Sequence, residues 1–559
     1  MTHAGESSVA GMATLETLQF DNTFIRELPG DELSQMDKVK ANVPRQVEGA
    51  MYSLVEPTRV AKPSLIAFSR ECAKLLGLSE EECARPEFAK ALGGNTLLSG
   101  SEPYAACYGG HQFGNWAGQL GDGRAMSLGE VVTGTGERWE LQLKGAGPTP
   151  YSRRADGRAV LRSSVREFLC SEAMFHLGVP TTRALSLVAT GDQVVRDVMY
   201  DGNPAPEPGA IVCRVAPSFI RFGNFEIFAA RGDKKNLERL ARYTLDRHFP
   251  DLSVEHDKPL TDALPKMLQR VCETTAEMVA AWQRVGFVHG VMNTDNMSIL
   301  GITIDYGPYG WVDNFDRKWT PNTTDNSMKR YCFYNQPGIC VWNLVRLANA
   351  LLPLVGEPAP LEQALASFEK TYLAVEARDR AAKLGFSEWR GGESGEDSKL
   401  WEDLEGLLEK WETDYTILFR QLAQVPAVSG PPPAAVDTDA MLDSVLARAF
   451  YAPPTPGQRV MWGKWLQRYV ARARDDGADD AARRARMDAV NPKYVLRNYL
   501  AQEAIERAEA SGDASSVHEL LELLRRPYDE QPDKEERFYQ RRPEWARSKV
   551  GCSALSCSS

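Results

Sequence analysis

Residues 289–310, HGVMNTDNMSILGITIDYGPYG, contain the side chains with the clearest chemistry in this sequence. Asn296 and Asp305 flank the apolar run MSILGITI, which contains one glycine and predicts a short hairpin that brings its two ends together. An amide oxygen and a carboxylate on such a turn are hard ligands of the kind that Mg²⁺ prefers, with Mn²⁺ as the alternative. The other interpretation is structural: Asp305 would cap a turn and Asn296 would be an ordinary loop residue.

The same stretch resembles the catalytic loop of protein kinases, H-x-D-x-x-x-x-N, which is followed by a hairpin and an aspartate. His289 and Asn296 have the spacing that this pattern requires, but the position of the catalytic aspartate holds Val291. Asp295 is the only carboxylate within the loop, so it could accept a proton from a substrate or only hydrogen-bond the loop. A general base contributes about 10²- to 10⁴-fold in rate, so its loss at position 291 need not abolish catalysis.

Lys144 ends a strand with alternating apolar residues, and Glu167 lies on the helix that follows. In kinases, a strand lysine paired with a helix glutamate holds a cation beside the nucleotide phosphates. Either residue alone could equally be a surface charge. The order along the chain is strand lysine, helix glutamate, loop asparagine and strand aspartate, and this order favours a nucleotide site.

Two further segments indicate an anion site. GQLGDGRA contains Gly121 and Gly123 beside Arg124, and glycines let backbone N–H groups approach a phosphate, although glycine-rich turns without a ligand are also common. CRVAPSFIRFG contains Arg214 and Arg221 among apolar residues. An unpaired buried charge is costly, so arginines in such a setting are expected to have an anionic partner; the alternative is two solvated surface arginines.

The hydrophobic pattern predicts an α+β fold, with a β-rich first part and a helical second part. Residues 126–145 predict a hairpin, residues 159–180 a helix that ends at Gly178 and Pro180, and residues 211–228 a strand with a loop. Further helices are predicted at 236–248, 262–286, 340–354, 360–382 and 400–423. Loops or connectors are predicted at 201–209, 390–399 and 425–437.

The 559 residues have a formal net charge of −11 and a pI near 5.4. The length favours two lobes with extensions, and the acidic balance argues against nucleic-acid or anionic-membrane partners, which call for a broad basic surface. The most apolar run, VWNLVRLANALLPLV, contains Arg346 and two asparagines, which indicates a core helix and no membrane span. The 10 cysteines lack zinc spacing, which is typical of reduced thiols inside a cell.

Several long runs resemble selenoprotein O, a pseudokinase family of protein adenylyltransferases. They are PYAACYGGHQFGNWAGQLGDGRA, ELQLKGAGPTPYSRRADGRAVLRSSVREFLCSEAM, CRVAPSFIRFGNFE, GFVHGVMNTDNMSILGITIDYGP and the terminal CSS. The likeness extends from LQFDN to the last residue. It implies a bilobal protein-kinase-like fold with four parts: an N-terminal extension (1–100), an N-lobe (101–217), a C-lobe (218–425) and a C-terminal helical extension with a redox tail (426–559).

The resemblance also implies that ATP binds in reverse orientation and that AMP is transferred to Ser, Thr or Tyr hydroxyls of proteins, with release of pyrophosphate. By this resemblance, Lys144 matches the phosphate-binding lysine and Glu167 its ion-pair partner, and Arg214 and Arg221 match phosphate contacts. The positions that match nucleotide contacts are Gly121, Gly123, Arg124, Asp156 and Gly157. Asn296 and Asp305 match the metal ligands, Asp305 also matches an ATP contact, and Asp295 matches the proton acceptor. Two rival functions stay open at this point: a kinase that transfers the γ-phosphoryl group, and a nucleotide-binding scaffold without catalysis.

Animal members of this family carry selenocysteine third from the C-terminus, where this chain has Cys557. A thiol is a poorer nucleophile than a selenol near neutral pH, so the change should weaken a redox role and leave the ATP chemistry intact. Cys552 and Cys557 could form a small-loop disulfide or pair with the thiols of a redox partner; the alternative is an inert, flexible tail. The expected location is a mitochondrion or plastid in a eukaryote and the cytoplasm in a bacterium.

Overall fold

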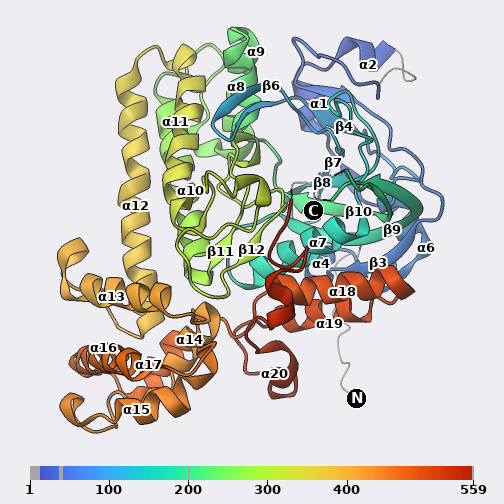
Figure 1. Cartoon of the computed structure of the whole chain (residues 1–559). Coiled ribbons are helices and arrows are strands. Elements are labelled where there is room, and N and C mark those ends of the chain that lie inside the picture. Colours follow the sequence, from blue (N-terminus) through green and yellow to red (C-terminus); the bar gives the residue numbers. More distant parts are fainter. Residues whose placement is uncertain (1–12, 37–41, 199–201, 557–559) are drawn as a thin grey trace, which may run out of the picture.

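The computed structural model describes residues 13–36, 42–198 and 202–556. It has an antiparallel sheet beside a larger helical part, which agrees with the predicted mixture of strands and helices (Figure 1). Across the sheet, the strands run β2 (Tyr52–Leu54), β4 (Tyr104–Ala106), β7 (Ala125–Val132), β8 (Arg138–Lys144), β10 (Ala205–Ala216), β9 (Arg183–Arg196) and β3 (Ser64–Phe68), and β1 (Gln19–Phe20) pairs with β7.

The predicted hairpin at 126–145 is β7 and β8. Its register matters for the site, because β10 lies beside β8 with Arg214 opposite Gln142 and Val212 opposite Lys144. Directly opposed residues of paired strands share one face of the sheet, and residues two apart share it as well. The side chains of Gln142, Lys144 and Arg214 are therefore on the same face.

The predicted helix at 159–180 is α7 (Leu161–His176), which packs against β9 and β10 and carries Glu167. The helices α18 (Asn498–Ser511) and α19 (Ser515–Leu524) also contact α7, so it lies between the sheet and the end of the chain (Figure 1). This explains why α7 is buried around nearly its whole circumference. Short helices flank the first strands: α1 (Thr23–Glu27), α2 (Glu32–Met36), α4 (Arg70–Leu75), α5 (Glu80–Ala84) and α6 (Pro86–Leu92).

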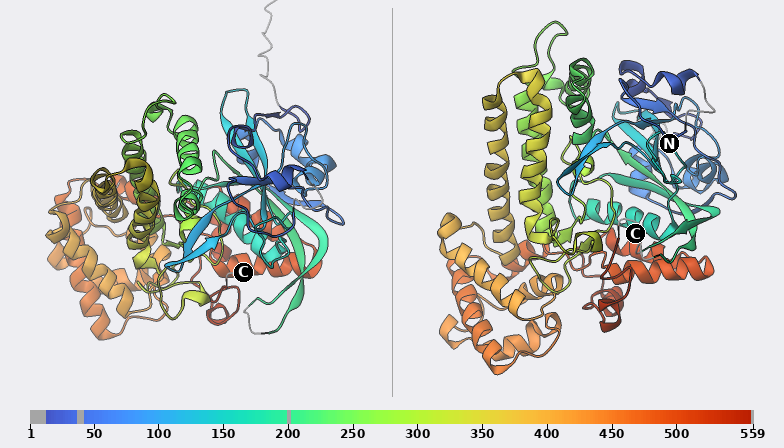
Figure 2. Two further views of the ribbon diagram at one scale, coloured as in Figure 1. Left: turned by 90° about the horizontal axis from the view of Figure 1, so that it is seen from above. Right: turned by 45° about the horizontal axis from the view of Figure 1, so that its top comes forward.

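Three long helices stand side by side next to the sheet: α10 (Ala263–Val285), α11 (Gln336–Val355) and α12 (Pro358–Leu384) (Figure 2). The segment Phe333–Val355, which includes α11, is long and apolar enough to cross a membrane by composition alone. Half of the most apolar stretch of this segment is buried, and α11 packs against α8, α10 and α12, which agrees with the predicted core helix. The remaining helices are α8 (Phe222–Ala230), α9 (Lys234–His248), α13 (Glu396–Lys410), α14 (Tyr415–Leu422), α15 (Thr438–Ala440), α16 (Pro456–Asp475), α17 (Asp480–Asp488) and α20 (Pro532–Phe538).

Two predictions around β10 were wrong. Residues 205–209 belong to β10 rather than to a loop. Residues 205–208 pair with β9, and within the described residues their other edge has no strand partner, so it tolerates Pro206 and Pro208, which lack an N–H group; Gly209 bridges Val160. Residues 222–228 are the start of α8 and not part of a strand or loop. This helix is buried on all sides between β5, α9 and α11, so its sequence lacks the amphipathic period of a surface helix.

Two helical-part predictions also needed correction. The run at 297–304 is a turn and not a two-stranded hairpin: Ser298 pairs with Arg221 and Thr303 with Thr181, so each half bonds another segment. The predicted helix at 400–423 is two helices, α13 and α14. Asp414 caps α14 by accepting from the backbone N–H of Ile417 at 3.0 Å, and α13 begins at residue 396, inside a predicted connector.

A separate two-stranded sheet consists of β5 (Gly109–Gln112) and β6 (Asn115–Gln119). It projects from the main sheet towards the helical part, where β5 contacts α8 and residues 294–296. In the helical part, β11 (Phe287–Val288) and β12 (Gly310–Trp311) bracket the predicted catalytic loop. The β5–β6 hairpin and the loop between β11 and β12 both contribute residues to the lining of one cavity.

Candidate active site

A cavity of about 770 Å³ lies where the sheet meets the helical part. This volume is typical of a site for a nucleotide-sized ligand. The sequence-predicted residues that line it are Gly121, Gly123, Arg124, Lys144, Asp156, Gly157, Arg214, Arg221, Asp295, Asn296 and Asp305. Glu167 lies behind Lys144 and outside the lining. The tertiary structure thus brings together every nucleotide and metal residue that the sequence predicted.

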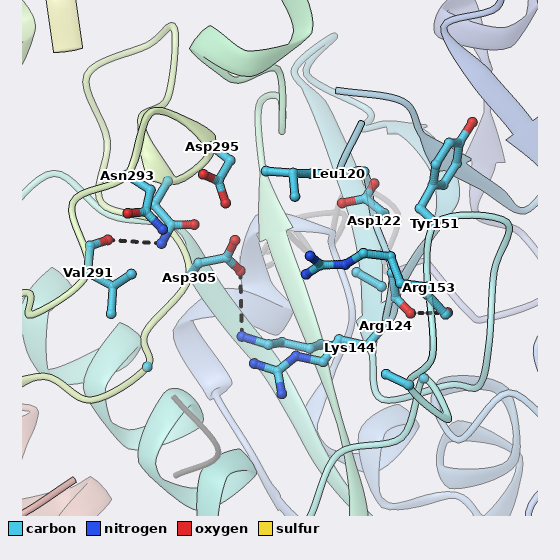
Figure 3. A pocket seen from close by; sticks show the side chains of 18 of the residues that line it. Leu120, Asp122, Arg124, Lys144, Tyr151, Arg153, Val291, Asn293, Asp295 and Asp305 are labelled. Carbon is cyan, nitrogen blue, oxygen red and sulfur yellow. Dashed lines mark hydrogen bonds and ion pairs between the residues drawn. The ribbon is translucent and has the colours of Figure 1, made fainter. Parts of the chain in front are cut away.

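Asp305 is the electrostatic centre of the cavity. Its carboxylate pairs with the guanidinium groups of Arg214 and Arg221, and the Lys144 Nζ lies 3.5 Å from Oδ1 (Figure 3). Burial alone would raise the pKa of Asp305, but the three cations outweigh it and hold that pKa well below its usual range. The backbone at Asp305 has φ +58°, a conformation that costs a non-glycine residue energy and is often found at functional sites.

The predicted strand–helix ion pair is present. Lys144 Nζ lies 2.6 Å from Glu167 Oε2, and Arg214 reaches Glu167 Oε1 at 3.1 Å. Burial lowers the pKa of Lys144, while Glu167 and Asp305 act in the opposite direction. Because Lys144, Arg214 and Glu167 are all more than nine-tenths buried, each charge depends on its partners.

The predicted catalytic loop is held by its own hydrogen bonds. The backbone N–H of Val291 donates to Nδ1 of His289 at 3.3 Å, so the proton of the neutral ring sits on Nε2, which donates to the Ile304 carbonyl at 3.0 Å. His289 thereby ties the loop to the residue before Asp305. Asn296 Nδ2 donates to the Val291 carbonyl at 2.9 Å, so the side-chain oxygen of Asn296 takes no part in that hydrogen bond. An amide oxygen and the carboxylate of Asp305 remain as hard ligands on the cavity wall.

Asp295 lies on the far side of Asp305 from Lys144 (Figure 3). Burial raises its pKa to about 7, because the hydrogen bond from Gln112 and the nearby Arg221 only partly offset the loss of solvent. A carboxyl group with this pKa exchanges protons readily near neutral pH, which suits a proton acceptor. Arg221 also donates to the backbone carbonyl of Asp295 at 2.8 Å, so one arginine connects the loop with Asp305.

The glycine-rich segment is shaped by Tyr151. A Cβ atom at Gly121 would lie 2.4 Å from the Tyr151 ring, and one at Gly123 would lie 2.8 Å from its carbonyl oxygen. Glycines at these positions therefore let the two loops pack closely along one wall. On the same wall, Asp156 is 46% exposed and pairs with Arg196 at 2.8 Å.

Several lining residues were not predicted from the sequence. Asp122 is 3.7 Å from Arg221 and accepts from the backbone N–H of Ala106 at 3.0 Å. Gln112 and Tyr151 also line the cavity, as do the arginines at 153, 154 and 158. The consecutive arginines in PYSRRADGR were a usable signal, whereas Gln112 comes from a hairpin whose position depends on the fold.

A second cluster of potential metal ligands consists of Glu71, Glu172 and His176. Arg183 donates to both oxygens of Glu172 at 2.9 and 2.6 Å, and the Arg525 guanidinium pairs with Glu71. These arginines already supply the positive charge that a metal ion would bring. The cluster is therefore a structural ion-pair network.

Comparison with known proteins identifies the family. The family model described as protein adenylyltransferase SelO matches residues 40–525. The chain belongs to the SelO family. It is 57% identical to protein nucleotidyltransferase YdiU of Azoarcus sp. (strain BH72), over 98% of this chain and 100% of that protein. It is 58% identical to protein nucleotidyltransferase YdiU of Xanthomonas campestris pv. campestris (strain 8004), over 97% and 99%, and 55% identical to that of Rhodopirellula baltica, over 97% and 99%.

Membership of the SelO family confirms the prediction that the chain is a protein adenylyltransferase, and it disfavours the kinase and scaffold alternatives.

The C-terminal segment of this SelO-family chain is packed up to residue 556. Cys552 and Leu555 are buried, the Leu555 backbone pairs with Asn322, and the Cys552 carbonyl accepts from Asn498 at 2.8 Å. This packing contradicts a flexible tail for residues 550–556, and a redox role for Cys552 stays a prediction. Cys557 lies outside the described residues, so its pairing with Cys552 stays a prediction.

Proposed function

We propose that ATP binds in this cavity with its β- and γ-phosphates innermost, held by Lys144, Arg214 and Arg221, and that AMP passes to a protein hydroxyl. The observation that carries the proposal is the convergence of these three cations on Asp305. Negative charge develops on pyrophosphate as the bond to the α-phosphorus breaks. Fixed cations in a site with little water stabilise such charge far more than they would in solution.

The inverted orientation of ATP is supported by the gradient of burial. Lys144, Arg214 and Arg221 are the deeply buried cations of the cavity, with exposed fractions of 7%, 1% and 1%. Triphosphate oxygens are the groups that best satisfy them. We place the adenosine towards the glycine-rich wall and the loop with Asp156 and Gly157, where the lining is more open.

The donor set fits a divalent cation. Asn296 offers an amide oxygen, Asp305 is ionised, and both line the cavity with the phosphate-binding cations. Mg²⁺, or Mn²⁺, would supply charge neutralisation across the phosphates when bound. Asp305 would then exchange part of its contact with the arginines for the metal, while the arginines turn to phosphate oxygens. Both exchanges keep every buried charge paired.

Asp295 is the proposed proton acceptor, and Val291 at the usual position of the base then has a physical explanation. Nucleotidyl transfer depends mainly on positioning and on charge stabilisation, so a carboxylate four residues further on is a sufficient base. The acceptors are Ser, Thr or Tyr hydroxyls of proteins.

We further propose that the sheet and the helical part correspond to the two lobes of a protein kinase, with the lobes at 101–217 and 218–425. A hairpin carrying Lys144, a helix carrying Glu167 and a loop carrying Asn296 occur in the order that this fold requires. Pairing of Cys552 and Cys557 with a thiol partner, and a reducing compartment of the cell, belong to the same proposal.

The test uses ATP labelled either at the α- or at the γ-phosphate, with purified protein and a protein acceptor. Adenylylation predicts that label from the α-phosphate enters protein and that label from the γ-phosphate leaves as pyrophosphate. Label entering only from the γ-phosphate would show a kinase, and label from neither would support a scaffold. A co-crystal with a non-hydrolysable ATP analogue tests the orientation: an adenine ring buried against Lys144 would refute it.

A further inference from the structure

The β5–β6 hairpin covers the catalytic loop. Among the described residues, its two strands pair only with each other, so its position depends on contacts with the loop and with α8. The backbone N–H of His111 donates to Thr294 Oγ1 at 2.7 Å, and that of Phe113 to Asn293 Oδ1 at 3.2 Å. The hairpin is therefore fixed to the two residues that precede Asp295.

The same hairpin contacts both oxygens of Asp295. Gln112 Nε2 donates to Oδ2 at 3.2 Å, which is the one hydrogen bond of the Gln112 side chain to the described residues. Oδ1 is buried and has no hydrogen-bond partner in the described part of the chain. It lies beneath Gly110: a Cβ atom there would be 2.8 Å from Oδ1 and 3.0 Å from the Asp295 Cβ. One oxygen is thus covered by backbone, and the other faces Gln112 and the cavity.

We infer that Gln112 is a positioning residue for the transfer reaction and that Gly110 is required for the same purpose. The inference rests on the proposed role of Asp295 as the proton acceptor. A carboxylate oxygen accepts more than one hydrogen bond, so Oδ2 can hold the Gln112 amide and still receive an acceptor hydroxyl. With Oδ1 covered by Gly110, the rotamer that presents Oδ2 to the cavity is the one that the hairpin selects.

The reaction that this geometry serves is the transfer of AMP from ATP to a hydroxyl group. The acceptor hydroxyl gives its proton to Oδ2 of Asp295 as its oxygen bonds to the α-phosphorus of ATP. The bond between that phosphorus and the bridging oxygen of pyrophosphate breaks, and pyrophosphate leaves with the electron pair. Gln112 neither gives nor takes a proton; it acts by holding the carboxylate, and misplacement of a reacting group by about 1 Å can cost about 10²-fold in rate.

The test measures the turnover of AMP transfer and the affinity for an ATP analogue separately. Gln112→Met keeps the length of the side chain and removes the donor; we expect the kcat for transfer to fall about 10-fold and the analogue Kd to stay within twofold. The matched control is Asn115→Ala on the same hairpin, whose exposed amide forms one side-chain hydrogen bond to the residues that the structure describes, to the Phe113 carbonyl at 3.4 Å. A kcat for Gln112→Met equal to that of the control would overturn the inference.

The background variant Asp295→Ala separates positioning from a general structural role. If Gln112 acts through Asp295, Gln112→Met should change the residual rate of Asp295→Ala by less than twofold. If the two losses multiply, Gln112 acts independently and the inference fails. If Asp295→Ala itself retains the wild-type rate, the proposed proton acceptor is wrong, which is a different result from failure of Gln112.

Gly110→Ala provides a second readout that does not need activity. In the wild-type background the new methyl group meets the Asp295 side chain, so we expect a lower thermal midpoint and a lower kcat. In the Asp295→Ala background the 2.8 Å contact with Oδ1 is removed and only the 3.0 Å contact with the Cβ of residue 295 remains, so the midpoint should fall less than it does in the wild-type background. A midpoint that falls equally in both backgrounds would show that Gly110 serves only the hairpin fold.

Discussion

Asp305→Asn tests the electrostatic centre of the site, because it removes one negative charge and almost no volume. In the structure this carboxylate is the shared counter-ion of Lys144, Arg214 and Arg221. If Asp305 were a metal ligand alone, its loss would leave the fold intact. The ion pairs change that expectation: the variant should lose both AMP transfer and stability.

The stability cost can be bounded from the structure. Removing one partner of a buried ion pair typically costs about 3–5 kcal/mol. The Asp305 side chain is 20% exposed, and Glu167 still neutralises part of the positive charge, so we expect about 2–3 kcal/mol. Asp156→Asn is the matched control, since its carboxylate lines the same cavity but is 46% exposed, and among the described residues its one ion-pair partner is Arg196; its cost should be about 0–1 kcal/mol.

The assay is urea unfolding at several pH values, with and without tripolyphosphate in the absence of divalent metal. Because the folded pKa of Asp305 lies well below its usual range, its stabilisation is lost only as pH falls below the unfolded pKa, and the deficit should be constant from about pH 6 to pH 8. Tripolyphosphate should reduce the deficit, because its oxygens replace the missing counter-ion. Equal stability of Asp305→Asn and wild type, or a deficit that the anion leaves unchanged, would refute this account.

Three further predictions concern the same site and the C-terminal segment. Lys144→Met should lower kcat/KM by about 10²- to 10³-fold, because a preorganised charge contact to the leaving group is lost, and steady-state kinetics with a protein acceptor would measure it. The rate of the wild type should fall as pH drops below about 7, because Asp295 must be ionised to accept a proton and its pKa is raised to about 7. Asp295→Asn should be slower by about 10²- to 10⁴-fold, and its rate should no longer fall with pH in this range. Removing residues 550–559 should leave ATP binding intact but cost about 2–3 kcal/mol in unfolding free energy, because Cys552 and Leu555 are buried; an unchanged unfolding midpoint would contradict the packing.

The sequence by itself determined the order and chemistry of the principal residues. The strand with Lys144, the helix with Glu167 and the loop with Asn296 could be predicted because period-2 and period-3.6 patterns are local. The long motifs supplied the rest through resemblance, including Asp156 and Gly157, which spacing alone did not reveal. Local pattern failed at α8 because that helix is buried all round, and at residues 205–209 because prolines are compatible with a free strand edge.

Only the tertiary structure decided how the charges are paired and what covers them. Asp305 is 91 residues from Arg214 and 84 residues from Arg221 in the chain, so their convergence depends on the register of β8 with β10 and on the placement of the loop. Gln112 shares no local motif with Asp295; a hairpin fold brings them within 3.2 Å. Hydrogen bonds and ion pairs act over a few ångströms of space, whereas sequence patterns record neighbours along the chain, and this difference separates what could be predicted from what had to be observed.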